Sequence, residues 1–264
     1  MVLPMGPATA KKTVEFPYYD AVKRTKTLHS AWRKVYSNGI RSKSLETRNL
    51  VKEFNNNSYS NIERIYRQLL RDKFRFAPAK GVPIPRPNKA PRPIVIAPIA
   101  NRIVQRSILD VLQCQDSIYR YINTPFSFGG IKDYNEPKGV QTAVAAAQTA
   151  IAQGAKWYIK SDINNFFTNI PKRMVINIVS SFIRDNKFSQ LFEAAIDVEL
   201  QNMAELGTKA ELFPIFEIGV AQGCCLSPLI GNILLHDFDA AMNGRGVTCL
   251  RYIDDFIIVQ ATYS

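Results

Sequence analysis

The feature that most constrains this chain is a pair of adjacent carboxylates, Asp254 and Asp255, placed between two short apolar runs. Residues 247–250 and 256–259 have the length and composition of strands, so the pair is predicted to lie in the turn of a hairpin. Two carboxylates on one tight turn repel each other unless a cation lies between them. Hard oxygen ligands suit Mg²⁺ or Mn²⁺. Because Asp-Asp is also a common turn dipeptide, a plain surface turn is the alternative.

Positive charge is concentrated in the first part of the chain. The 264 residues carry a net charge of +12, but residues 1–106 hold 22 Lys and Arg against 6 Asp and Glu. Residues 107–264 hold 12 against 16. We therefore expect a basic lobe that binds polyanions and a more acidic lobe that can hold metal. The alternative is the solvated basic surface of a soluble protein.

Composition excludes several classes of protein. Hydrophobic residues make up 46% of the chain, which indicates a globular protein rather than a disordered one. We find no apolar run long enough to span a bilayer and no signal peptide, so no membrane partner is expected. The four cysteines form no Cys-x-x-Cys pair, which argues against a zinc site and a disulfide framework. This usage favours a reducing, cytoplasmic location.

The basic part has two regions of different character. Residues 18–75 are predicted to be mostly helical, with aromatic side chains among the cations. This mixture suits contact with nucleic acid, although aromatics buried on amphipathic helices explain it equally well. Seven prolines exclude a helix from residues 76–99 and favour two strands joined by a basic tip, residues 86–92. The forks of Arg86 and Arg92 match phosphate oxygens, and a solvated turn is the alternative.

A third carboxylate, Asp162, ends the strand predicted over residues 157–162, and the carboxyl end of a strand is well placed for a site. Helices are predicted over residues 101–113, 140–152, 186–206 and 227 to about 242, and another is predicted to open at Pro171. Ser227 is the predicted N-cap of the last helix. Just before it, Gly223 would let backbone approach a ligand closely, and a simple turn is the alternative.

Together these carboxylates suggest a chemistry. Asp162, Asp254 and Asp255 could hold two Mg²⁺ ions about 3.5–4 Å apart, the usual arrangement for in-line phosphoryl transfer. One ion would activate a 3′-hydroxyl, and the other would neutralise the triphosphate and the leaving pyrophosphate. Ions and arginines would stabilise a transition state that is largely electrostatic.

Six short motifs follow one another along the chain in an order typical of one enzyme family. They are Pro83-Ile84-Pro85-Arg86 with Arg92-Pro93-Ile94, Arg102-Ile103-Val104-Gln105, Ser127-Phe128-Gly129-Gly130, Asp162-Ile163-Asn164-Asn165-Phe166-Phe167, Gln222-Gly223-Cys224-Cys225-Leu226-Ser227-Pro228 and Tyr252-Ile253-Asp254-Asp255. The series resembles the reverse transcriptase family, most nearly the bacterial group II intron, retron and phage-defence enzymes. The resemblance covers about residues 30–260, and residues 32–39 resemble the N-terminal extension of those enzymes.

This resemblance implies a role for each motif. Asp162 and Asp254 would bind metal and act in catalysis, with Asp255 as a weaker ligand and the backbone carbonyl of Ile163 as another. Phe167 would be the bulky gate that excludes a ribose 2′-hydroxyl. Besides this gate, the nucleotide-binding residues would be Arg86, Arg92, Gln222 and Gly223, and the template- or primer-binding residues would be Lys89, Arg102 and Tyr252.

The implied fold is α+β, the fingers and palm of a right-hand polymerase, with an antiparallel palm sheet that presents the three carboxylates on one surface. We expect an N-terminal arm over residues 1–29, basic fingers with an N-terminal extension over residues 30–106, and a palm with interleaved fingers elements over residues 107–264. Members of the family normally continue into further palm strands, a primer grip and a helical thumb. The sequence ends nine residues after Asp255, so we expect weak processivity or no activity from this polypeptide alone, unless a partner chain completes it.

The implied partners are an RNA template, a DNA or RNA primer, deoxynucleoside triphosphates and two Mg²⁺ ions, for which Mn²⁺ can substitute. Two other functions stay open. A viral-type RNA-dependent RNA polymerase would share the carboxylates but would carry a small or polar residue in place of Phe167. The second alternative is a catalytically impaired RNA-binding remnant or subunit, against which the intact carboxylates argue. The motifs do not discriminate between intron mobility, retron synthesis and phage defence.

Overall fold

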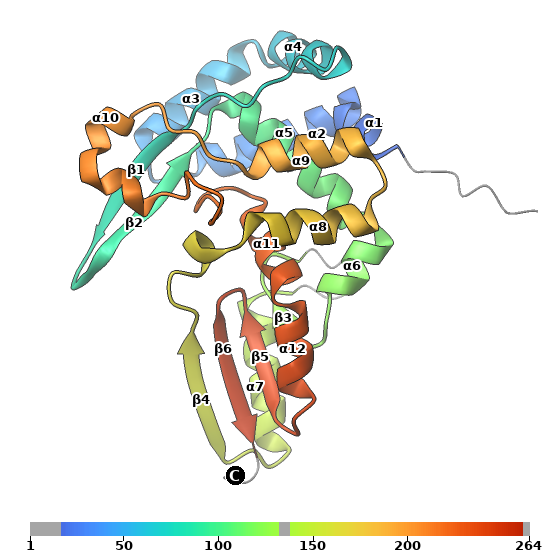
Figure 1. Ribbon diagram of the computed structural model, residues 1–264, viewed down its shortest axis with the longest axis vertical. Helices are drawn as coiled ribbons and strands as arrows, with labels where there is room; N and C mark the ends of the chain where they lie inside the picture. Colours follow the sequence, from blue (N-terminus) through green and yellow to red (C-terminus); the bar gives the residue numbers. More distant parts are fainter. Residues whose placement is uncertain (1–16, 132–137, 261–264) are drawn as a thin grey trace, which may run out of the picture.

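A computed structural model of the chain describes residues 17–131 and 138–260 (Figure 1). Helices and a two-stranded ribbon make up the upper part of the molecule in this view, and a four-stranded sheet with flanking helices makes up the lower part. The predicted loose arm at residues 1–10 lies outside the described residues.

The first helices of the chain pack around α5. The bounds are Tyr18–Lys23 for α1, Thr25–Ile40 for α2, Leu45–Asn56 for α3, Ser58–Leu70 for α4 and Ile99–Gln113 for α5. Apolar residues at helical spacing put Ile103, Val104 and Ile108 on the buried side of α5, where none is exposed to solvent. The prediction of a mostly helical segment from residue 18 is confirmed. The proposed boundary between residues 29 and 30 falls inside α2.

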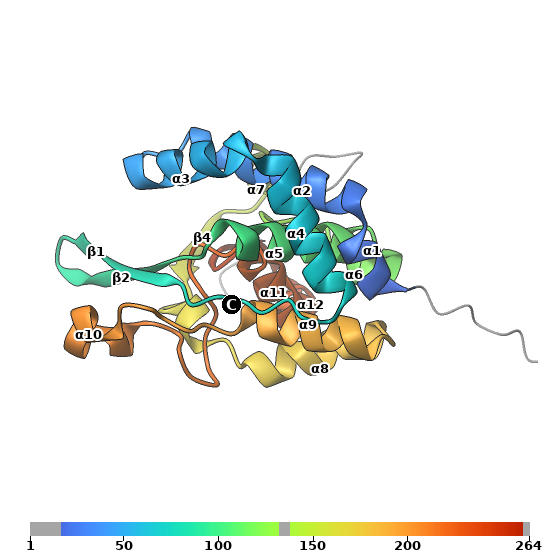
Figure 2. The same cartoon turned by 90° about the horizontal axis from the view of Figure 1, so that it is seen from above.

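A two-stranded antiparallel ribbon extends between α3 and α10 (Figure 2). Its strands are β1, Lys80–Arg86, and β2, Lys89–Ile96. Arg86 pairs with Lys89, so the turn consists of Pro87 and Asn88 alone, with Asn88 at a φ of +53°. The prediction of a basic loop over residues 86–92 is therefore wrong in extent. Continued strand pairing places both arginines and Lys89 within the strands.

The four-stranded sheet has the order β3-β5-β6-β4. The bounds are Ser127–Phe128 for β3, Trp157–Asp162 for β4, Thr248–Tyr252 for β5 and Asp255–Gln260 for β6. The β4–β6 and β5–β6 pairs are antiparallel, as predicted, but the short β3 pairs with β5 in parallel. Helix α7, Val140–Ala152, and helix α12, His236–Asn243, both contact β5.

The remaining helices connect the two parts of the molecule. Their bounds are Asp116–Ile122 for α6, Lys172–Phe182 for α8, Asn186–Ile196 for α9, Met203–Leu206 for α10 and Ser227–Leu234 for α11, with 3₁₀ turns η1 at Phe166–Asn169 and η2 at Gly207–Leu212. None of the helices in the described ranges has the length and apolarity needed to cross a membrane.

Two predicted helices are interrupted. The one expected over residues 186–206 ends at Ile196, because the next segment bonds to Ala79 on both sides: the Ala79 N–H donates to the Glu199 carbonyl at 2.7 Å, and the Gln201 N–H donates to the Ala79 carbonyl at 2.9 Å. The helix expected from Ser227 to about residue 242 is divided at Leu235 into α11 and α12.

The predicted N-cap of α11 is also wrong. Ser227 is the first helical residue and makes no capping bond. Its hydroxyl donates instead to the carbonyl of Ala221 at 2.7 Å, which fixes the segment leading into the helix. A serine beside a helix start can take either partner, and here the buried carbonyl takes the hydroxyl.

Truncation of Ile103 to Ala should lower the free energy of unfolding by about 2–5 kcal/mol, because it leaves a cavity at the centre of the helical part. The matched control is Leu70→Ala, which removes a side chain that is 50% exposed. Urea unfolding of both variants measures the difference. Equal losses would contradict the position assigned to α5 in the core.

Candidate active site

The β5–β6 turn lies at the end of the sheet that faces the helical part (Figure 1). Of the carboxylate pair predicted for this turn, only Asp254 lies in it, because Asp255 already pairs with Tyr252 as the first residue of β6. Asp255 pairs with Asp162 across the β4–β6 ladder, and opposite residues of an antiparallel pair project to the same face. The N–H of Ile163 donates to the carbonyl of Asp254 at 3.0 Å. Main-chain bonding therefore brings together the carboxylates of two motifs that are far apart in the sequence.

The turn itself is strained. Ile253 has a φ of +60°, a left-handed conformation that costs a β-branched residue about 1–3 kcal/mol. Its N–H donates to the carbonyl of Phe128 at 3.2 Å. Gly129, which follows, leaves room for the turn, since a Cβ there would lie 3.0 Å from side-chain atoms of Ile253 and Tyr252. Tyr252 is thus half-buried against the glycine loop rather than extended into solvent.

Electrostatics at the turn are unfavourable to three free carboxylates. Burial raises the pKa of Asp254 above its ordinary value, and the charges of Asp255 and Asp162 raise it further, while its own backbone N–H and Arg92 act in the opposite direction. Asp162 and Asp255 are exposed, whereas Asp254 is half-buried. The carboxylates are therefore close enough to feel one another's charge.

The oxygen atoms available at the turn are chemically suited to bind a divalent cation. Carboxylate oxygens and a neighbouring backbone carbonyl, that of Ile163, are the ligands that Mg²⁺ prefers, and a cation relieves the repulsion that raises the pKa of Asp254. Within the part of the chain that the structure describes, no group of three or more His, Cys, Asp or Glu residues is arranged to hold a metal ion. The carboxylates are thus neighbours, not a preassembled cage of three ligands.

The three cations of the β1–β2 ribbon have different surroundings. Arg92 is exposed, and its charge acts to lower the pKa of Asp254. The Nε of Arg86 donates to the Ala90 carbonyl at 2.9 Å and so closes the ribbon tip. Lys89 is exposed at that tip. Of the three, Arg92 is the cation whose charge acts on the pKa of Asp254.

The Gln222-Gly223 segment is bonded to the ribbon. The Val95 N–H donates to the Gln222 carbonyl at 2.9 Å, and Ile94 forms an isolated parallel bridge with Gln222. Gly223 has a φ of +110°, and a Cβ there would lie 2.9 Å from the Val95 carbonyl oxygen. The close neighbour of this glycine is the backbone of β2, so the predicted close approach of a ligand to Gly223 stays a prediction.

The two adjacent phenylalanines after Asp162 have different roles in the packing. Phe166 is buried beneath α11, where a Cβ on Gly231 would lie 2.8 Å from its ring. Phe167 is only half-buried, and its carbonyl accepts the N–H of Val220 at 2.7 Å. Phe167 is therefore the ring that stays accessible, and its backbone is fixed against the segment that leads to Gln222.

A cavity of about 950 Å³ lies behind this segment, between β2, α5 and α9. Arg102 lines it, and its guanidinium makes no hydrogen bond or ion pair with any residue that the structure describes. Burial lowers the pKa of Arg102, and proximity to Cys225 acts in the opposite direction. Ile94 and Gly223 line the same cavity. The sequence indicated the arginine but gave no indication of the cavity.

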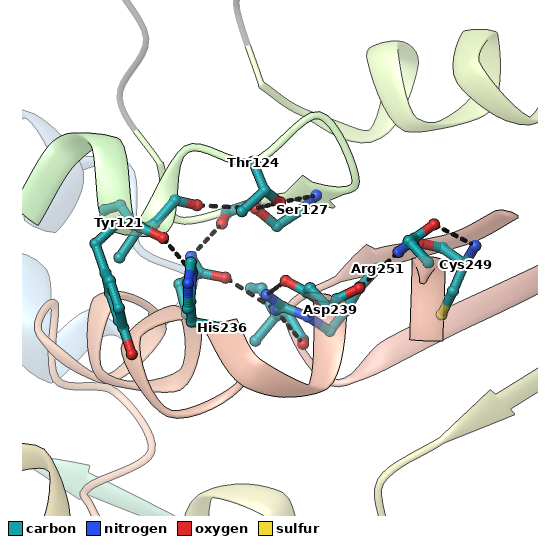
Figure 3. A network of polar contacts seen from close by, with 12 residues as sticks. Tyr121, Thr124, Ser127, His236, Asp239, Cys249 and Arg251 are labelled. Carbon is teal, nitrogen blue, oxygen red and sulfur yellow. Dashed lines mark hydrogen bonds and ion pairs between the residues drawn. The ribbon is translucent and has the colours of Figure 1, made fainter. Parts of the chain in front are cut away.

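Sequence reasoning missed a buried ion pair near the turn. Arg251 and Asp239 are each 1% exposed and form a two-bond ion pair, Nε to Oδ1 at 2.7 Å and Nη2 to Oδ2 at 2.5 Å (Figure 3). Arg251 immediately precedes Tyr252 in a strand whose previous residues, Cys249 and Leu250, are buried and apolar. A charge within an apolar strand was the sequence feature that could have identified it.

Similarity to known proteins agrees with this geometry. A family model described as reverse transcriptase (RNA-dependent DNA polymerase) matches residues 84–264. The right-hand polymerase fold and the paired carboxylates define a nucleotide-polymerising class of protein. The chain belongs to the reverse transcriptase family, as its motifs predicted.

Curated relatives include several proteins encoded in introns. The chain is 28% identical over 178 residues to an uncharacterized 91 kDa protein in the cob intron of Schizosaccharomyces pombe, covering 67% of this chain and 20% of the relative. It is 27% identical over 183 residues to protein YkfC of Escherichia coli, covering 67% and 45%. It is 26% identical over 224 residues to the group II intron-encoded protein LtrA of Lactococcus lactis, covering 84% and 34%. The chain thus spans between a fifth and just under half of these relatives.

A solved structure described as a partial Cas6-RT-Cas1–Cas2 complex has a similar fold. Its TM-score is 0.55 at 20% identity, over 100% of this chain and 42% of that one. The predicted α+β fold of fingers and palm is confirmed.

Substitution of Gly223 by Ala should destabilise the protein by about 1–3 kcal/mol more than the same change at Gly154. Both glycines have similar φ values, +110° and +103°, but a Cβ on Gly154 meets nothing within 4 Å. The difference in unfolding free energy between the two variants therefore isolates the contact with the Val95 carbonyl. Equal destabilisation would show that the 222–223 segment is not held against β2.

Proposed function

We propose that this chain carries the nucleotidyl-transfer site of an RNA-directed DNA polymerase, which adds deoxynucleotides to a primer 3′-hydroxyl on an RNA template. The observation that carries the proposal is the joining of Asp162 to the Asp254-Asp255 turn by the β4–β6 pairing and by the bond from the Ile163 N–H to the Asp254 carbonyl. Membership of the reverse transcriptase family supports the same reaction.

The residues divide the work of phosphoryl transfer as follows. Two Mg²⁺ ions, or Mn²⁺, bound by the carboxylates and the Ile163 carbonyl supply the positive charge that in-line displacement needs. Arg92 binds triphosphate oxygens through its planar fork and orients the nucleotide. Burial raises the pKa of Asp254 in the free protein, and a bound cation would favour its ionised form. Gln222 and Gly223 support the nucleotide from the side of β2.

The template is proposed to pass by the cavity behind the 222–223 segment. A guanidinium without a protein partner, that of Arg102, is suited to a phosphate, and apolar walls such as Ile94 are suited to a base. Lys89 at the ribbon tip and Tyr252 beside the turn would contact template or primer. Because phosphate contacts release counterions, template affinity should fall steeply with salt.

The choice of substrate sugar is assigned to Phe167. Its half-buried ring, five residues after Asp162, is proposed to exclude a ribose 2′-hydroxyl, which favours a DNA polymerase over an RNA-dependent RNA polymerase. A catalytically impaired RNA-binding subunit is the alternative from another class. A partner chain is proposed as well, since the solved structures of similar fold are described as complexes.

Primer extension on an RNA template with Mg²⁺ and deoxynucleotides tests the proposal. We expect Asp254→Asn to reduce extension about 100-fold or more, because it removes a charge that the transition state needs. The control is Glu205→Gln, which removes an exposed carboxylate on α10 and should leave extension unchanged. Extension that persists in Asp254→Asn would refute the assignment, and RNA binding without extension by any form would favour the subunit.

Replacement of Phe167 by Val should raise ribonucleotide incorporation relative to deoxynucleotide by about tenfold or more, because the smaller side chain admits a 2′-hydroxyl. The matched control is Phe166→Leu, which changes the buried neighbour and should affect stability without changing sugar discrimination. Competition between the two nucleotide types in the extension assay gives the ratio. An unchanged ratio in Phe167→Val would show that Phe167 does not discriminate between the two sugars.

A further inference from the structure

The buried ion pair of Arg251 and Asp239 does more than join two elements. Arg251 uses Nε and Nη2 on Asp239 (Figure 3). Its remaining Nη1 donates to Asn232 Oδ1 at 2.9 Å and to the carbonyl of Ile253 at 2.8 Å. A buried ion pair is in itself weak evidence for stability, because apolar residues of similar size often replace it without loss. The bond to Ile253 gives the pair a second role.

Ile253 is the strained residue of the turn, and it directly precedes Asp254. A backbone conformation of this kind persists where its surroundings hold it. Two described bonds do so: the Ile253 N–H donates to the Phe128 carbonyl at 3.2 Å, and the Ile253 carbonyl accepts from Arg251. The residue that precedes Asp254 is therefore held at both of its backbone polar groups, its N–H and its carbonyl.

Asn232 bonds both to Arg251 and to the glycine loop that follows β3. Its Oδ1 accepts from Arg251, and its Nδ2 donates to the carbonyl of Gly129 at 3.0 Å. Gly129 follows Phe128, the residue that accepts the N–H of Ile253. Asn232 lies on α11 and Asp239 on α12, so two helices set the orientation of a single guanidinium.

We propose that Arg251 is a positioning residue that, held by Asp239 and Asn232, fixes the Ile253 carbonyl and with it the placement of Asp254. Its effect on catalysis rests on the function proposed above, but its effect on the turn does not. Arginine is required because one side chain must donate in three directions from a rigid plane, which the compact ammonium of lysine cannot do.

The test separates positioning from stability. The double variant Arg251→Met/Asp239→Leu replaces the pair with apolar residues, so that neither partner is left as a buried unpaired charge. We expect it to keep a cooperative thermal transition near that of the wild type. Amide hydrogen exchange at Ile163, whose N–H bonds to the Asp254 carbonyl, should be about tenfold faster or more, and the dissociation constant for Mn²⁺ should rise about 10- to 100-fold.

If the double variant does not fold, hydrogen exchange at Ile163 and Mn²⁺ affinity are measured on Arg251→Lys, which keeps the positive charge. Lys172→Met is the control, since it removes a buried lysine that bonds to Asp197 at 2.8 Å, outside the Arg251 network. It should lower stability without changing Mn²⁺ affinity or singling out the Ile163 amide. Wild-type exchange at Ile163 in a folded Arg251 variant would overturn the proposal.

If the proposed polymerase function is wrong, the experiment gives a different result from the one expected if only the role of Arg251 is wrong. If the wild type extends no primer or binds no Mn²⁺, exchange at Ile163 still decides whether Arg251 fixes the turn. If the wild type is active, the folded variants should lose turnover at saturating nucleotide while the KM for nucleotide stays nearly constant. Normal turnover together with normal exchange would leave the pair a purely structural role.

Discussion

The candidate site depends on the register in which β4 pairs with β6. This pairing puts Asp162 opposite Asp255, and a slip of one residue would turn the side chain of Asp162 to the other face of the sheet. β4 is an edge strand whose six residues are all exposed, so its own side chains bury little surface that could fix the register. The main-chain ladder, extended past its end by the Ile163 N–H, is the principal constraint.

The helical part reaches the same site through a second main-chain connection. The Val95–Gln222 bond places the ribbon that carries Arg92 against the segment that opens α11. From there α11 and α12 run to Asn232 and Asp239, the partners of Arg251. The 222–223 segment and the carboxylate turn are thus connected through α11 and α12.

Local patterns predicted the elements that local forces determine. The helix at 140–152 and the strand at 157–162 have the predicted bounds, because alanine content and a short aromatic and β-branched run act over a few neighbouring residues. The predictions that were wrong concern elements whose bounds depend on residues distant in the sequence. The end of α9 depends on bonds from the following segment to Ala79, which no pattern within residues 186–206 contains.

The same distinction applies to the site. The carboxylates and Phe167 could be found because each belongs to a short motif, whereas the ion pair could not, because Asp239 and Arg251 come from a helix and a strand. Nor does the sequence show that the Arg86 side chain bonds to the Ala90 carbonyl within its own ribbon. These differences arise from packing, which a linear motif does not describe.

The two bonds that assemble the site, Ile163 to Asp254 and Val95 to Gln222, join backbone groups only. Every amino acid except proline supplies the N–H that each of them needs. Evolution could therefore replace the side chains at all four positions without losing the hydrogen bonds that hold the site together. Such a skeleton tolerates sequence divergence of the extent seen here, where identity to the relatives is 26–28%.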